Sequence, residues 1–200
     1  MSAGDERAER LPREQTLADK SVLLRLMTQS DQEPMLRFAS ALPDHDLLFL
    51  MRDITQPAVI RKWLDEVQSG RMIGLVAEGN NRFLGTATVI PSDEPWSTHV
   101  GELRVLVSVD MRGTGLGTVL VQEAFASALD LGMERLVVRM TPDQKGAIAV
   151  FEGLGFRPEG VLRDHVRDLR GKKHDLLVMG HDVRGFQAVL GAYGFTDALS

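Results

Sequence analysis

The sequence predicts an α/β (α+β) fold in which one mixed sheet of about seven strands is flanked by four helices. Strand and helix patterns follow one another in the order β, two helices, three β, helix, β, helix, two β. A strand pair over residues 71–90 is joined by a tight Gly-Asn-Asn turn, which requires antiparallel neighbours and excludes a purely parallel, doubly wound sheet. The 200 residues suit a single domain with its own core.

The N-terminal third contains one strand and two helices by pattern. Residues 1–20 are rich in Glu, Arg and Asp without an apolar period, so we expect a mobile arm. Residues 21–27 form an apolar strand candidate. Residues 31–42 and 57–68 carry apolar side chains at helical spacing with a proline in the first turn, which predicts two helices. The apolar residues 44–55 between them favour neither period.

The middle of the chain is predicted to supply most of the sheet. Residues 71–78 and 82–90 are the two strands of the hairpin, and Gly and Asn at its turn tolerate positive φ. Residues 91–98 are rich in turn-forming residues and are predicted to form a loop. Residues 99–109 (HVGELRVLVSV) then predict a long strand.

The last part alternates helices and strands. Residues 117–131 repeat apolar side chains every three or four positions and precede a C-capping glycine, which predicts a helix. A short β-branched strand is expected at 135–140 and a second helix at 141–154. Strands anchored at 161–166 and 176–179, with a polar turn between them, complete the pattern.

The domain boundaries follow from these elements. Residues 21–183 are expected to form one domain, and the glycine-interrupted residues 184–200 a peripheral C-terminal tail.

Composition excludes several classes of function. There is no cysteine, so disulfides, thiolate metal sites and a cysteine nucleophile are excluded. The net charge of -5 argues against nucleic-acid binding. No stretch has the roughly 18 apolar residues of a membrane span, and the polar start lacks a signal-peptide core, so a cytoplasmic protein without membrane partners is expected. The histidines are scattered, so no metal is expected.

A glycine-rich loop carries the clearest functional signal. The segment RGTGLG at residues 112–117 lies between a predicted strand and a predicted helix. Free N–H groups and the dipole at a helix N-terminus bind anions, and glycines let phosphate oxygens approach the main chain. Arg112 adds a permanent charge with fork geometry. A P-loop would need a lysine after the glycines, and the dinucleotide fingerprint needs a glycine spacing that is absent here, which disfavours a nucleotide-dependent oxidoreductase.

This R-x-x-G-x-G pattern after a strand resembles the pyrophosphate loop of the GNAT superfamily of N-acetyltransferases. A second element agrees with it. The family commonly has a helix with Asn, Ala three residues later, Tyr seven residues later, and then Gly-Phe opening the next strand. Gln144, Ala147, Phe151 and Gly155-Phe156 stand at these spacings, so the resemblance covers roughly residues 99–182 and implies a GNAT-like single domain.

The resemblance implies acetyl-CoA as cosubstrate. Pantetheine would insert between the central strand and the strand after the loop helix, as an added strand does. The N–H of Val107 would then lie near the thioester carbonyl and stabilise the oxyanion by about 3 kcal/mol. The residues expected to bind the cofactor are Leu106, Val107, Val109, Arg112, Gly113, Thr114, Gly115, Leu116, Gly117, Thr118, Gln144 and Phe151.

A general base would keep the attacking amine neutral, and Glu102 in the central strand is the candidate. An exposed strand glutamate beside Arg104 is an equally good interpretation of the same residue. His99, His165 and His174 are weaker candidates. Three positions depart from the family pattern: Phe151 replaces the Tyr that often protonates the CoA thiolate, Gln144 replaces Asn, and Val109 replaces Pro.

The resulting prediction is an N-acetyltransferase that transfers the acetyl group of acetyl-CoA to a primary amine, small molecule or protein, by direct attack. The alternative is a GNAT-fold module that binds acyl-CoA with little or no turnover, which Phe151 keeps open. The identity of the amine acceptor is not encoded in a recognisable motif. A homodimer is a further expectation, because relatives often dimerise.

Overall fold

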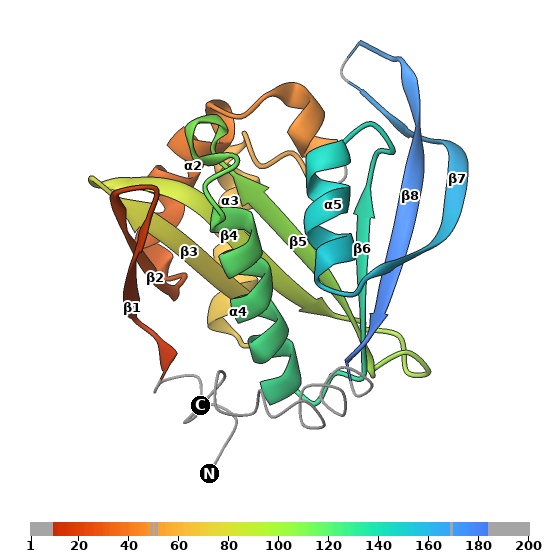
Figure 1. Ribbon diagram of the computed structural model, residues 1–200, viewed down its shortest axis with the longest axis horizontal. Coiled ribbons are helices and arrows are strands. Elements are labelled where there is room, and N and C mark those ends of the chain that lie inside the picture. The colour runs from red at the N-terminus through yellow and green to blue at the C-terminus, as the bar shows by residue number, and fades with distance from the viewer. Residues whose placement is uncertain (1–9, 49, 51, 169, 184–200) are drawn as a thin grey trace.

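The computed structural model describes residues 10–48, 50, 52–168 and 170–183, which form one eight-stranded sheet with helices on both faces (Figure 1). Across the sheet the strands are β1 (Arg13–Leu17), β2 (Lys20–Leu26), β3 (Ile73–Gly79), β4 (Arg82–Pro91), β5 (Val100–Val107), β6 (Arg135–Met140), β8 (Lys173–Asp182) and β7 (Arg157–Arg167). Every neighbouring pair is antiparallel except β5 and β6, which are parallel. The predicted mixed α/β class is confirmed, with one strand more than expected.

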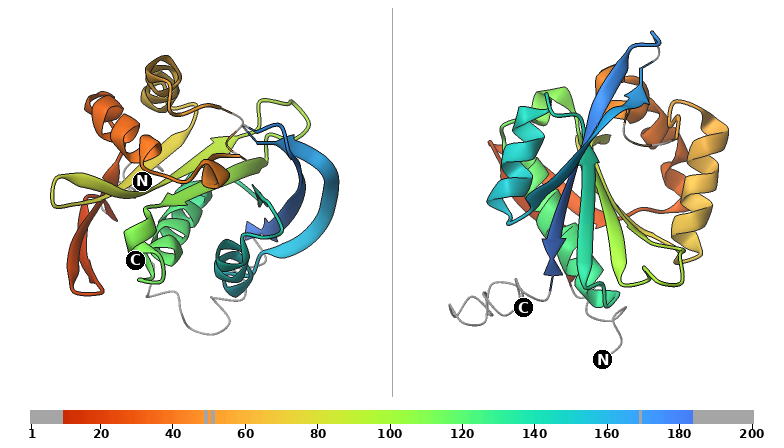
Figure 2. Two further views of the ribbon diagram at one scale, coloured as in Figure 1. Left: turned by 90° about the horizontal axis from the view of Figure 1, so that it is seen from above. Right: turned by 90° about the vertical axis from the view of Figure 1, so that its right-hand side faces the viewer.

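The helices cover the two faces of the sheet separately (Figure 2). Helices α2 (Gln32–Ser40) and α3 (Pro57–Gln68) pack on one face around a core that includes Phe38 and Trp63. Helices α4 (Leu116–Asp130) and α5 (Lys145–Gly153) pack on the other, around Leu120 and Phe156. All four predicted helices are present. Among the described residues, no helix is long and apolar enough to cross a membrane.

The additional strand, β1, lies within the segment expected to be a mobile arm. Residues 13–17 pair with β2 in an antiparallel hairpin, and Arg10 donates hydrogen bonds to Asp130 at 2.7 Å and to the buried Glu123 at 3.2 Å on α4. The sequence REQTL has no apolar alternation because this edge strand is exposed on most of its length. Residues 1–9 of the expected arm and the expected tail 184–200 lie outside the described residues.

The central strands separate partway along their length. β5 and β6 are paired only at Val100, Gly101 and Glu102. Beyond that point β5 stays paired with β4 as far as Val107, whereas β6 stays paired with β8 as far as Met140. The two neighbouring strands therefore part in the middle of the sheet, on the side where both of their C-terminal ends lie.

The outer edge of the sheet, β7, has an irregular strand. Its register against β8 shifts between Leu162 and Val166, and Asp164 has a φ of 51° within this bulge. Nearly all of its side chains are exposed, including Val161 and Leu162. Three arginines and two acidic residues, Glu159 and Asp164, are spread along the same strand.

Close packing of α4 against β4 requires a glycine. A Cβ on Gly85 would lie 2.8 Å from Cδ1 of Leu120 and 2.9 Å from the carbonyl oxygen of Leu106. Gly85→Ala should therefore lower the free energy of unfolding by about 1–3 kcal/mol, as overpacking does. Urea unfolding measures the change. The control is Gly153→Ala, where nothing lies within 4 Å of the added Cβ and no loss is expected. Equal stability of Gly85→Ala and wild type would contradict this packing.

The buried His181 should make stability depend on pH. Its ring lies 5.1 Å from the rings of Phe125 and Phe156, and burial lowers its pKa below the ordinary 6.5. The unfolded chain takes up this proton first as pH falls, so the contribution is complete above about pH 6.5 and is lost below it. Urea unfolding at pH 7.5 and 5.5 should show a larger loss for wild type than for His181→Gln. Parallel losses in the two proteins would show that His181 is not responsible.

Candidate functional site

The glycine-rich turn between β5 and α4 is open to an approaching ligand. After the short 3-10 helix η3 (Val109–Met111), Gly113 has a φ of 75° and Gly115 a φ of 91°, in the left-handed region that favours glycine. No atom lies within 4 Å of the position that a Cβ would take at either glycine. Gly115 is the N-cap of α4, and no side chain caps that end.

The first turn of α4 presents backbone donors. The N–H of Val119 bonds the carbonyl of Gly115 at 3.1 Å, so the N–H groups of residues 116–118 precede the first intrahelical bond. Together with the helix dipole they make an anion site. The Thr114 hydroxyl donates to the carbonyl of Met111 at 2.7 Å, so in this conformation it stabilises the turn. Leu116 is buried in the core, and a Cβ at Gly117 would lie 3.7 Å from Val107, at an ordinary contact distance.

Charged side chains flank this turn on both sides. Arg112 follows η3 and donates a hydrogen bond to the carboxylate of Asp46. Asp110 accepts a hydrogen bond from Arg82 and lies 3.6 Å from the ammonium of Lys20. The hydrogen bond from Arg82 is the main cause that lowers the pKa of Asp110 to about 2. The turn is thus held by ion pairs to segments distant in sequence.

The separated part of β5 turns main-chain groups toward β6. The N–H of Ser108 donates to the carbonyl of Leu84 in the β4 segment at 2.9 Å. Backbone groups alternate in direction along a strand, so those of Val105 and Val107 point the other way, into the gap that β6 leaves. Leu106 has its backbone directed to β4 and its side chain in the α2–α3 core. Val109 lies in η3 and is 54% exposed.

Glu102 lies where β5 and β6 begin to separate. Its Oε1 accepts a hydrogen bond from Nε of Arg104 at 2.7 Å, and its Oε2 accepts one from Nη1 of Arg139 on β6 at 3.0 Å. Arg104 also donates to the carbonyl of Leu50 at 2.7 Å. Both carboxylate oxygens of the candidate base therefore face guanidinium groups in this conformation, and Glu102 joins the two strands at the base of the gap.

The two α5 residues of the predicted set have different surroundings. Gln144 is the N-cap of α5, and its side-chain oxygen accepts a hydrogen bond from the N–H of Thr141 at 3.2 Å. Phe151 is 6% exposed, with its ring 5.1 Å from that of Phe156. Phe151 packs in the core and has no proton to donate.

Prediction from the sequence did not identify His45 and Asp46 as candidate site residues. Both lie in η2 (Asp44–Leu47), a short 3-10 helix in the connection between α2 and α3. Nε2 of His45 is 3.1 Å from Oγ1 of Thr141 and 3.1 Å from Oδ2 of Asp143, and its neighbour Asp46 contacts Arg112. The ring of His45 is 5.7 Å from that of His174. The polar Asp-His-Asp run inside an apolar stretch was the available signal.

The candidate histidines do not gather at one point. His174 bonds Asp168 at 2.8 Å within the β7–β8 hairpin, and His165 and His99 have exposed side chains. Among the described residues, no three histidine or acidic side chains converge to hold a metal ion.

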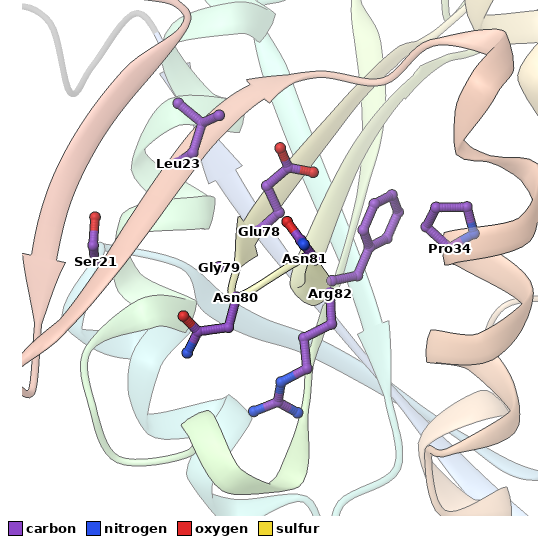
Figure 3. Close-up of a pocket in the computed structure, with 9 residues that line it drawn as sticks. Ser21, Leu23, Pro34, Glu78, Gly79, Asn80, Asn81 and Arg82 are labelled. Atoms are coloured by element: carbon purple, nitrogen blue, oxygen red, sulfur yellow. The ribbon is translucent and has the colours of Figure 1, made fainter.

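A surface cavity lies away from the candidate site. It opens beside the β3–β4 turn, with a volume of about 390 Å³, and includes no residue of the predicted set (Figure 3). Its lining includes the polar Glu78, Asn80, Asn81 and Arg82 and the apolar Phe83 and Pro34.

Comparisons with known proteins agree on one family. The sequence model of the acetyltransferase (GNAT) family matches residues 30–156, more than half of the chain. A Bacillus subtilis protein with a provisional phosphinothricin acetyltransferase name is 28% identical over 89 residues, which are 44% of this chain. The match spans 54% of that relative, about half of its length.

Solved structures extend the likeness to about four fifths of the chain. A GNAT-family acetyltransferase from Streptococcus pneumoniae superimposes with a TM-score of 0.70 and 21% identity, over 80% of this chain and 99% of that one. A Salmonella typhimurium structure determined with its cofactor acetyl-CoA gives a TM-score of 0.70 and 19% identity, over 81% of this chain and 94% of that one.

The site thus combines an open helix N-terminus with a gap between parallel strands, as an anionic and extended ligand requires. The family match covers every element from α2 to α5, including the turn and the gap. The chain belongs to the acetyltransferase (GNAT) family.

Proposed function

We propose that the protein transfers the acetyl group of acetyl-CoA to a primary amine by direct attack. The observation that carries this proposal is the separation of β5 from β6 beside an open, glycine-rich helix N-terminus. Such a gap fits an extended pantetheine chain, and the helix end fits its diphosphate. The neighbour that contains acetyl-CoA has the same fold and supports this choice of donor.

In this proposal the donor is held mainly by the main chain. The N–H groups of residues 116–118 and the side chain of Arg112 bind the diphosphate oxygens. Val105 and Val107 supply the backbone groups that pair with the amide groups of pantetheine. Because Leu106 turns its backbone away from the gap, its part is to hold β5 against the α2–α3 core.

The chain's own residues then assist the transfer. The N–H of Val107 points into the gap and donates to the carbonyl oxygen as negative charge develops on it. The amine nitrogen forms a bond to the acetyl carbon, the carbon–sulfur bond breaks, and the electron pair leaves with sulfur. Glu102 accepts the proton lost by the amine, directly or through water, once one of its guanidinium partners withdraws.

A binding module with little turnover is the second candidate. The favouring observation is Phe151, which is buried against Phe156 where relatives often have a proton-donating Tyr. Under this candidate the protein binds acetyl-CoA through the same turn and gap but does not acetylate amines.

One assay separates the two candidates. The protein is titrated with CoA by calorimetry and incubated with acetyl-CoA and a panel of polyamines, amino acids and peptides, with release of free thiol as the readout. Thiol release that depends on one of the amines supports the transferase. CoA binding without any amine-dependent release supports the binding module. Absence of CoA binding overturns both.

Gly115→Asp should abolish measurable CoA binding by calorimetry. The substitution puts a carboxylate where the diphosphate is expected, and Asp tolerates the left-handed conformation better than most residues. Gly115→Asn is the matched control because it has the same size and conformational preference without the charge. It should bind CoA at least tenfold more tightly than the Asp variant. Normal CoA affinity in Gly115→Asp would refute the role of this turn.

Glu102→Gln should lower kcat at least tenfold while changing CoA affinity less than threefold. The amide keeps the shape of the side chain but no longer takes up the amine proton. Steady-state rates across pH, together with calorimetry and thermal unfolding as a check on the fold, provide the measurements. An unchanged pH–rate profile would remove Glu102 from the proton transfer and leave its link between Arg104 and Arg139 as its role.

A further inference from the structure

The η2 segment is attached to both sides of the gap. Its consecutive residues His45 and Asp46 reach in different directions: His45 contacts Thr141 and Asp143, which follow β6, and Asp46 contacts Arg112, which follows β5 and η3. In Figure 1 the connection between α2 and α3 crosses the upper end of the sheet, where both strands finish. The segment therefore bridges the ends of the two strands that separate.

The contact between Asp46 and Arg112 involves the group that is expected to bind the donor. The side chain of Arg112 is 47% exposed, so it is accessible to a ligand, whereas Asp46 is 18% exposed and largely covered. A guanidinium that lies against a carboxylate has fewer donors left for diphosphate oxygens, and the two anions would repel each other across it. The diphosphate and Asp46 therefore compete for the guanidinium of Arg112.

After leaving Arg112, the carboxylate of Asp46 would still lie on the side of the sheet from which we expect the acceptor to approach. η2 joins α2 to α3, and both helices lie on the face opposite α4 and α5 (Figure 2). An amine must approach the thioester from a side that the donor does not fill. Asp44 on the same segment and Asp143 beside His45 add negative charge to this end of the sheet, which favours a cationic ligand.

We propose that Asp46 exchanges partners during the reaction: it pairs with Arg112 in the free protein and with a non-reacting ammonium group of the acceptor after the donor's diphosphate has taken Arg112. This inference rests on the proposed function. It makes Asp46 a specificity-determining residue, because the acceptor's positive charge is recognised by a carboxylate that only the donor releases. Donor and acceptor binding are then coupled, and each strengthens the other.

The exchange predicts opposite effects of one substitution on the two substrates. Asp46→Asn removes the competing carboxylate from Arg112, so CoA should bind about two- to fivefold more tightly by calorimetry, the range expected for a partly exposed ion pair. With acetyl-CoA saturating, KM for the amine that the panel acetylates fastest should rise about tenfold and kcat should change less. A purely structural role of Asp46 would instead weaken both ligands together and lower the thermal unfolding midpoint.

Asp44→Asn is the matched control. It removes the same charge from the same segment, and Asp44 makes no side-chain ion pair with any other described residue. Its CoA affinity should stay within about 1.5-fold of wild type, because the exposed Asp44 does not pair with Arg112.

Three results decide the matter. CoA affinity in Asp46→Asn that equals or falls below that of Asp44→Asn overturns the exchange at Arg112. Tighter CoA binding without a rise in the amine KM overturns the acceptor role. If the wild-type protein does not bind CoA, both the proposed function and the exchange are overturned. This outcome is recognised before any variant is compared, because it concerns the wild-type protein alone.

Discussion

The candidate site depends on the point in the sheet where β5 and β6 stop pairing. β5 is bonded to β4 along its length, and β6 is bonded to β8, so the two parallel strands share only three residue pairs. Backbone N–H and C=O groups need partners. Those of Val105 and Val107 face a strand that has turned away, and an extended molecule could pair with them in its place. The glycine turn, Glu102 and η2 all lie around this one discontinuity.

Much of the fold and the glycine-rich turn could be predicted because the signals are local. The helical spacing of apolar residues predicts helices over residues 57–68 and 117–131, and the structure has α3 and α4 there. The Arg-Gly-Thr-Gly-Leu-Gly run, placed between a predicted strand and a predicted helix, predicts a glycine-rich helix N-terminus, and Gly115 is the N-cap of α4. β1 was missed because an exposed edge strand needs no apolar face, so REQTL resembles any polar arm. Its pairing with β2 became visible only in three dimensions.

The rest of the candidate site depends on contacts between residues far apart in sequence. Asp46 and Arg112 are 66 positions apart, and Glu102 and Arg139 are 37 apart. No rule of residue spacing in the sequence predicts such ion pairs. The sequence presented Glu102 equally as a base or as a neighbour of Arg104, and the structure adds Arg139 as a second partner. Its chemical role therefore stays a prediction, as does that of each residue expected to touch the cofactor.

The bulged outer strand has a consequence for behaviour in concentrated solution. A long, flat edge strand offers unpaired backbone groups to any other chain and seeds sheet-to-sheet aggregation. β7 carries Val161 and Leu162 on such an edge, but the register shift around Asp164 twists it, and the charges of Arg163 and Arg167 oppose close approach of a like surface. Straightening this strand by deleting the bulge would remove a safeguard that keeps individual molecules apart.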